Sequence, residues 1–129
     1  MNTPTVLVVD DEPLARWSVS ETLRDSGYRV TQAGDALSAL AALNGSGCTA
    51  DLVLLDLRLP DSSDLGVLSM MRRLSPKTPI ILMTAYGSEK LSADARTRGA
   101  YAVIDKPFDM SVLAPLVADA IDGRQPSLY

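Results

Sequence analysis

Four apolar runs recur along the chain, and a polar residue follows each of them directly. None of the four alternates between apolar and polar positions, which is typical of parallel strands that are covered on both faces. The segment 28–33 does alternate, so we expect it to form a strand at the edge of the same sheet. The uninterrupted runs are residues 5–9, 52–55, 80–83 and 101–104.

The segments between these runs carry the start and stop signals of helices. Pro13 suits the first turn of a helix that Gly27 ends. Pro115 lies inside the last helical segment, where its missing N–H predicts a kink or a delayed helix start. The other helices are expected to begin at the capping residues Asp35, Asp64, Ser88 and Asp109, and three of them to end at residues 44–45, at Gly99 and near residue 121.

Five strands that alternate with five helices predict an open parallel α/β sheet with helices on both faces. The connections between such strands are right-handed, which limits the possible strand orders. With 129 residues, of which 47% are hydrophobic, the chain is long enough for one domain with its own core. We expect that domain to span residues 1–122, and residues 123–129 to form a tail or the start of a linker.

The composition excludes several kinds of chemistry. There is no histidine, which rules out histidine catalysis, histidine metal ligands and a phosphohistidine on this chain. Cys48 is the single cysteine, so no internal disulfide forms, and a reducing, cytoplasmic setting fits. No apolar run approaches the ~20 residues that a membrane-spanning helix needs.

The charge pattern argues against direct binding to nucleic acid. The net charge is −4, and the chain has no long basic run. A short basic cluster is formed by Arg72, Arg73 and Lys77. We interpret this cluster as the solvated end of a helix, so DNA binding would need another domain.

Polar side chains follow four of the predicted strands at their carboxyl ends. Asp10 and Asp11 follow the first strand, Asp56 the third, Thr84 the fourth and Lys106 the fifth. Taken singly, these residues could be helix-capping acids, a loop acid, a strand-end hydroxyl and a solvated lysine. In open parallel sheets, however, the reacting groups gather at this edge, near the point where the strand order reverses. Their joint placement favours one common site.

Three carboxylates in one cleft repel one another, and each raises the pKa of its neighbours unless a cation relieves the conflict. Oxygen ligands of this kind suit Mg²⁺, which keeps several of its waters and leaves the site open. A free carboxylate beside such a metal is placed to attack phosphorus, while the lysine adds a positive charge and the threonine a hydrogen-bond donor. The residues therefore predict phosphoryl transfer that depends on Mg²⁺.

Four motifs then carry a resemblance to a known family. They are Val8-Val-Asp-Asp-Glu-Pro13, Asp56-Leu-Arg-Leu-Pro-Asp61, Met83-Thr-Ala85 and Asp105-Lys-Pro-Phe-Asp109. In their order and spacing the chain resembles, from about residue 4 to residue 122, the receiver domains of bacterial two-component response regulators, most closely the nitrogen-regulatory class. The resemblance implies a flavodoxin-like (βα)5 doubly wound parallel sheet with strand order 2-1-3-4-5.

The resemblance also implies roles for the matching residues. Asp56 would accept the phosphoryl group, Lys106 would contact that group and pair with Asp56 in its absence, and Thr84 would swing inward to bond a phosphoryl oxygen. The bond between Lys106 and Pro107 would be cis. For Mg²⁺, the implied ligands are Asp11 directly, Asp10 mostly through water, Asp56, and the backbone carbonyl of Arg58.

A receiver domain implies partners as well as chemistry. A sensor histidine kinase would donate the phosphoryl group, and an ATPase or DNA-binding output domain would belong to the full-length protein. A homodimer could form through the fourth helix, fifth strand and fifth helix. We expect a signalling switch that is not an enzyme, although it would catalyse its own phosphorylation and slow dephosphorylation. Arg58 and Tyr86 would shape the access of the hydrolytic water.

Besides Pro115, two positions depart from the family pattern. The family usually has Tyr or Phe three residues before the lysine, where this chain has Val103. We expect Tyr101 to share a face with Val103 but not to replace that aromatic switch, so the coupling would run through Thr84 and residues 85–88. Asp64 replaces a frequent glycine, and we expect it to serve as a helix cap.

Three other functions remain to be weighed. A phosphohydrolase with an aspartyl nucleophile usually has an acid two residues after the nucleophile, where this chain has Arg58. A flavodoxin-like cofactor binder needs a loop that cradles phosphate after the first strand, where two aspartates would repel it. A pseudo-receiver that never takes phosphate would not need the complete set of site residues.

Overall fold

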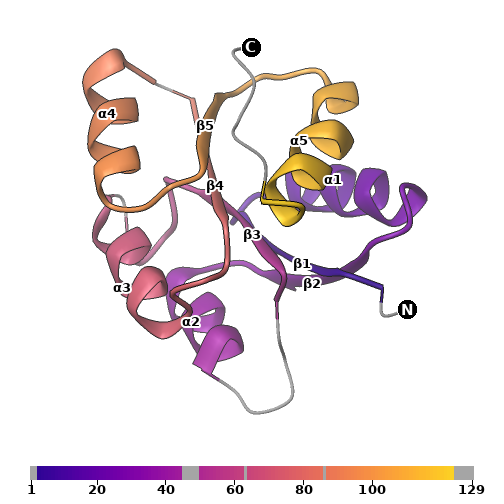
Figure 1. Ribbon diagram of the computed structural model, residues 1–129, viewed down its shortest axis with the longest axis horizontal. Helices are drawn as coiled ribbons and strands as arrows, with labels where there is room; N and C mark the ends of the chain where they lie inside the picture. The colour runs from indigo at the N-terminus through magenta and orange to yellow at the C-terminus, as the bar shows by residue number, and fades with distance from the viewer. Residues whose placement is uncertain (1–2, 45–49, 63, 86, 124–129) are drawn as a thin grey trace.

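The computed structural model describes residues 3–44, 50–62, 64–85 and 87–123, and it shows one parallel sheet between two layers of helices (Figure 1). The strands are β1 (Thr5–Val9), β2 (Arg29–Ala33), β3 (Leu52–Asp56), β4 (Ile80–Thr84) and β5 (Ala102–Asp105). The helices are α1 (Pro13–Asp25), α2 (Ala36–Asn44), α3 (Gly66–Leu74), α4 (Glu89–Thr97) and α5 (Leu113–Ile121), and a 3₁₀ turn, η1 (Met110–Val112), precedes α5. The expected tail after residue 123 lies outside the described residues.

The strand order confirms the predicted flavodoxin-like topology. It is β2-β1-β3-β4-β5, and every pairing is parallel. The chain moves outward from β1 to β2 and then crosses back to β3, so the order reverses between β1 and β3. Register brings the carboxyl ends of the inner strands together, because Val9 pairs with Leu55 and Asp56 pairs with Met83.

Alternation along the strands divides the core into two layers. Leu7 and Leu55 face the layer that contains α2, α3 and α4, whereas Val8 and Leu54 face the layer that contains α1 and α5. All residues of β3 and β4 are buried, because helices cover both of their faces. β2 lies at the edge with Arg29 and its other polar positions partly exposed, which confirms the prediction from its alternating pattern.

The predicted helix caps are confirmed in part. The Ser88 side chain accepts a hydrogen bond from the Leu91 N–H at 3.0 Å, and Asp35 accepts one from the Ser38 N–H at 2.7 Å. Asp109 caps η1 rather than α5. Asp64 accepts from the Gly66 N–H at 2.8 Å, but Leu65 holds the cap position of α3, so the predicted cap was one residue too early.

Pro115 delays the start of the last helix, as predicted. The segment begins as the 3₁₀ turn η1 and becomes α-helical at Leu113. Pro115 is then the third residue of α5, in the first turn, where backbone N–H groups have no partner within the helix. The missing N–H of proline therefore costs α5 no hydrogen bond.

Within the described ranges, no helix combines the length and the apolar character that crossing a membrane requires.

Packing between the sheet and its helices predicts how two leucines should respond to truncation. Leu68 of α3 is fully buried in the layer with α2 and α4, whereas Leu37 of α2 is 74% exposed. We expect Leu68→Ala to lower the free energy of unfolding by about 2–5 kcal/mol, because it removes buried methyl groups and leaves a cavity. Leu37→Ala should change it by less than about 0.5 kcal/mol. Urea titrations followed by circular dichroism measure both, and equal losses would contradict this account of the core.

Candidate functional site

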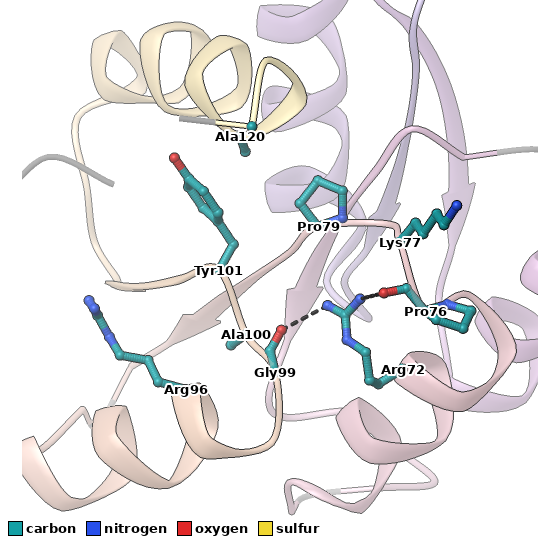
Figure 2. A pocket seen from close by; sticks show the side chains of 10 residues that line it. Arg72, Pro76, Lys77, Pro79, Arg96, Gly99, Ala100, Tyr101 and Ala120 are labelled. Atoms are coloured by element: carbon teal, nitrogen blue, oxygen red, sulfur yellow. Dashed lines mark hydrogen bonds between the residues drawn. The ribbon is translucent and has the colours of Figure 1, made fainter. Parts of the chain in front are cut away.

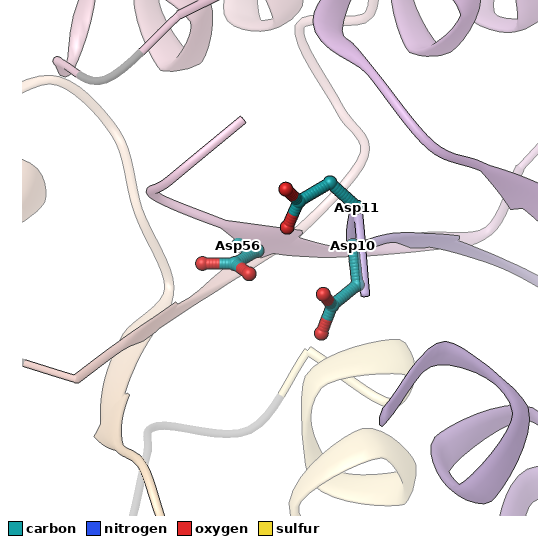
Figure 3. Close-up of side chains that lie close together, drawn as sticks. All are labelled: Asp10, Asp11 and Asp56. Carbon is teal, nitrogen blue, oxygen red and sulfur yellow. The ribbon is translucent and has the colours of Figure 1, made fainter. Parts of the chain in front are cut away.

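Two neighbouring strands deliver the three predicted aspartates to one place. Asp10 and Asp11 follow β1 directly, and Asp56 is the last residue of β3. Each side chain offers a carboxylate oxygen that lies within 4.8 Å of the other two, and Figure 3 shows the three groups around a common centre. Asp10 is fully buried and Asp56 is 7% exposed, whereas Asp11 is exposed to solvent.

Lys106 reaches the same centre from the end of β5. Its Nζ donates to Asp10 Oδ2 at 2.7 Å and to Asp56 Oδ2 at 3.2 Å, and both contacts are also ion pairs. The pairing with Asp56 was expected from the sequence. The shorter contact with Asp10 was not, so one ammonium links the ends of β1 and β3. The Lys106–Pro107 bond is cis, as the resemblance implied.

Backbone N–H groups orient two of the three carboxylates. The Glu12 N–H donates to Asp10 Oδ1 and the Arg58 N–H donates to Asp56 Oδ1, each at 3.0 Å. In each case an aspartate bonds to the backbone two residues later, a local turn that fixes the side chain where the strand ends. These bonds leave oxygen lone pairs of both aspartates available to other ligands, because a carboxylate has about four acceptor sites.

Burial and the nearby opposite charges shift the pKa values of Asp56 and Lys106 in opposite directions. Burial raises the pKa of Asp56 above its usual value, and the Arg58 N–H and Lys106 only partly offset this effect. Burial lowers the pKa of Lys106, but the hydrogen bond to Asp10 and the negative charges of Asp56 and Asp10 outweigh it, so the net shift is upward. Lys106 is therefore held as an ammonium ion, while Asp56 gains from any further positive charge.

The acidic centre opens into a pocket of about 400 Å³. Thr84, at the end of β4, is 3% exposed and lines this pocket beside Ala85. The structure thus brings together the predicted phosphoacceptor, its two predicted partners Lys106 and Thr84, and the residues predicted to bind metal, including Arg58. Tyr86, which we expected to shape water access, lies outside the described residues. The pocket is lined by Asp10, Asp11, Glu12, Asp56, Leu57, Arg58, Thr84, Ala85 and Lys106.

The donor set of this pocket fits a hard divalent cation. Three carboxylates converge within 4.8 Å, and Lys106 is the one ammonium bonded to them within the described part of the chain. Oxygen ligands on one side with open space on the other match the preference of Mg²⁺ for a few carboxylates and several waters. The acidic cluster that such a cation requires is therefore present.

One expectation about β5 was wrong. Val103 packs in the layer with α2, α3 and α4, but Tyr101 packs against the opposite layer with α5. The prediction assumed that strand alternation extends back to Tyr101, whereas β5 begins only at Ala102. Tyr101 is therefore not on the face where the family usually has its aromatic switch.

A second pocket of about 680 Å³ lies at the opposite end of the sheet (Figure 2). There Arg72 donates to the Pro76 carbonyl at 2.8 Å and to the Gly99 carbonyl at 2.7 Å. Arg72 is half-buried and joins the end of α3 to the turn before β5, so our interpretation of it as part of a solvated helix end was wrong. Its guanidinium is engaged by backbone carbonyls, and none of the described residues that line this pocket is acidic.

Asp61 has a role that the sequence did not reveal. Its two carboxylate oxygens accept hydrogen bonds from the Ala36 N–H at 2.8 Å and from the Leu37 N–H at 3.0 Å. These are the first two residues of α2, so the loop after β3 holds the start of a different helix. The partners are 25 and 24 residues apart in the sequence, so no local pattern could indicate the contact.

Comparison with known proteins agrees with this geometry. A family model described as the response regulator receiver domain matches residues 6–118. The chain belongs to this family. Receiver domains are the signalling domains of two-component response regulators, so both the resemblance and the fold class are confirmed.

Individual relatives support the same assignment. The "probable transcriptional regulatory protein TcrX" of Mycobacterium tuberculosis is 42% identical over 106 residues, which cover 82% of this chain and 44% of TcrX. The DNA-binding transcriptional regulator NtrC of Salmonella typhimurium is 33% identical over 120 residues, or 93% of this chain and 25% of NtrC. The chain thus spans a quarter to less than half of these two relatives. The nitrogen-regulatory resemblance is confirmed by NtrC.

Solved structures show the same fold. The CheY-like receiver domain protein of Methanospirillum hungatei superimposes with a TM-score of 0.88 at 29% sequence identity, covering 95% of this chain and 96% of that one.

The Asp61 contact predicts a local effect of acid. Hydrogen bonds from Ala36 and then Leu37 hold the pKa of Asp61 below its usual range. The contact therefore stabilises the folded state at pH values above the pKa of Asp61 in the unfolded chain. This stabilisation is lost as the pH falls through the lower pKa of Asp61 in the folded chain. We expect Asp61→Asn to speed hydrogen exchange at the Ala36 and Leu37 amides and to remove its acid dependence. Asp109→Asn, a matched control, should affect η1 alone. Unchanged exchange in Asp61→Asn would count against this role.

Proposed function

We propose that this receiver domain is a switch in which Asp56 accepts a phosphoryl group from the phosphohistidine of a sensor histidine kinase. One observation carries the proposal: the nearly buried Asp56 carboxylate lies on the pocket wall with Asp10 and Asp11 within 4.8 Å and Lys106 Nζ at 3.2 Å. The ammonium ion of Lys106, together with a cation held among the aspartates, would offset the negative oxygens that the reaction gathers at that point.

The transfer itself is a displacement at phosphorus. A carboxylate oxygen of Asp56 forms the new P–O bond while the P–N bond of the phosphohistidine breaks, and the leaving imidazole takes a proton from solvent. Lys106 then moves from pairing with Asp10 and Asp56 to contacting an oxygen of the transferred group. Hydrolysis of the acyl phosphate by water, shaped in part by Arg58, restores the carboxylate.

We further propose that Asp10, Asp11, Asp56 and the backbone carbonyl of Arg58 hold Mg²⁺ at this site. When bound, Mg²⁺ supplies positive charge to the oxygens of the transferring group. The mixed exposure of the aspartates supports this proposal, because Asp11 faces the solvent from which a hydrated ion arrives.

The phosphoryl group would act on the rest of the domain through Thr84. Thr84 lines the pocket, and it leads into the loop before α4. Of the residues in α4, only Ala95 is buried, so little packing energy opposes a shift of this helix. A bond between Thr84 and a phosphoryl oxygen would therefore change the surface around α4.

The remaining parts of the proposal concern the protein beyond this domain. We propose that residues 1–122 form the receiver domain of a cytoplasmic regulator, which continues into an ATPase or DNA-binding output domain as in NtrC-like proteins. Phosphorylation would be read by that domain, or by a homodimer formed through α4, β5 and α5. The domain would catalyse only its own phosphorylation and dephosphorylation, and Arg58 in place of an acid argues against phosphohydrolase turnover.

The acceptor role is tested with beryllofluoride and Mg²⁺, which together mimic the phosphoryl group. We expect wild type to bind the mimic with changes in the amide spectrum around residues 56–58 and 84–85, and Asp56→Asn not to respond at saturating concentrations. Asp25→Asn removes an exposed carboxylate at the end of α1 and should behave as wild type. An equal response from Asp56→Asn and wild type would overturn the assignment.

The route of coupling is tested by removing one hydroxyl. Thr84→Val keeps the side-chain shape, so beryllofluoride should still bind at saturating concentrations, but about tenfold or more weakly than to wild type, since a hydrogen bond to a charged group contributes about 1.5–3 kcal/mol. The α4 amide resonances should no longer move. Thr22→Val removes an α1 hydroxyl that bonds to the Ser18 carbonyl and serves as the control. Full α4 shifts in Thr84→Val would show that the signal takes another path.

A further inference from the structure

We propose that Arg16 is a positioning residue for the acidic pocket, because it fixes the peptide group that joins Asp10 to Asp11 and thereby aims Asp11 at the cation. This inference rests on the proposed function, since it concerns how the same pocket is kept ready for Mg²⁺.

Arg16 joins three segments that the sequence keeps apart. From the first turn of α1, its Nη1 donates to the Asp10 carbonyl at 2.7 Å, and its Nε donates to Gln32 Oε1 on β2 at 3.0 Å. Gly34, in the turn after β2, lies against the same guanidinium, because a Cβ at that position would be 3.2 Å from Nη1. The absence of a side chain at Gly34 therefore makes room for Arg16.

Asp11 depends on its backbone more than the other two aspartates do. The Asp10 carboxylate is held by Lys106 and the Glu12 N–H, and the Asp56 carboxylate by Lys106 and the Arg58 N–H. Asp11 is exposed, and among the described residues its carboxylate has no comparable hydrogen bond or ion pair. Its direction is set by the peptide plane that precedes it.

That peptide plane is the group to which Arg16 bonds. The carbonyl oxygen of Asp10 and the N–H of Asp11 belong to one rigid unit, so a bond to the oxygen limits rotation of the whole unit. Rotation would swing the Asp11 side chain away from Asp10 and Asp56. Residues that hydrogen-bond to metal ligands without binding the metal themselves commonly fix the orientation of those ligands.

The charge of Arg16 by itself predicts the opposite effect on Mg²⁺ affinity, so the direction of the measured change tests the proposal. A guanidinium near the pocket repels a divalent cation, so removing it would strengthen Mg²⁺ binding if Arg16 acted only through its charge. If Arg16 acts by positioning Asp11, removing it weakens Mg²⁺ binding in spite of the lost repulsion.

The experiment measures the Mg²⁺ dissociation constant of the 129-residue chain by calorimetry and by amide chemical shifts. We expect Arg16→Ala to raise this constant about tenfold, in the range seen when supporting partners of metal ligands are lost. Arg16→Lys keeps the charge but loses the fork that bonds two acceptors, so it should recover only part of the affinity. Arg24→Ala removes the same charge from an exposed position on α1 and should leave the constant unchanged.

A double-mutant cycle separates positioning from general destabilisation. If Arg16 acts through Asp11, then Arg16→Ala should change the Mg²⁺ dissociation constant little in an Asp11→Asn background. A merely structural residue would weaken binding by the same factor in both backgrounds, and that result would overturn the proposal. So would an unchanged or lower dissociation constant in Arg16→Ala. Wild type that bound no Mg²⁺ at all would instead refute the metal site of the proposed function.

Discussion

The electrostatic balance between three crowded carboxylates and one ammonium is the constraint on which this site depends. Asp10, Asp11 and Asp56 approach within 4.8 Å, and Lys106 is bonded to the two that are buried. The charges in the pocket do not cancel, because one ammonium ion faces three carboxylates. Burial sharpens the imbalance and raises the pKa of Asp56. A pocket of this kind gains when cations enter it, because added positive charge offsets the surplus of carboxylates.

The parallel sheet makes such crowding possible. Its inner strands are buried on both faces, so they are held rigidly, and their register brings Asp10, Asp56, Thr84 and Lys106 to the same edge. These side chains are therefore held at or next to the ends of rigid strands. By contrast, α4 buries only Ala95, so the helix next to Thr84 has the fewest buried residues of the five α-helices. Rigidity at the site and weak packing beside it are what a switch requires.

Contacts between loops complete the site. Asp61 holds the start of α2, and Arg16 ties the end of β1 to β2, so both turns around the pocket are anchored to elements other than their own. At the far end of the sheet, Arg72 makes a similar link between α3 and the turn before β5. Each of the three uses a charged side chain to bond backbone groups at the start of a helix or in a turn that would otherwise lack partners.

The sequence by itself determined the strands, the helices, the topology and the candidate site residues. The strands and helices follow from local patterns, namely uninterrupted apolar runs and helix start and stop signals, whereas the strand order and the roles of the site residues follow from the resemblance that four spaced motifs carry. Only the tertiary structure decided that Lys106 bonds to Asp10 as well as Asp56, that Asp61 caps α2, that Arg72 is engaged, and that Tyr101 faces α5. These features join groups that are distant in sequence, or depend on where a strand begins, and periodicity carries no information about either.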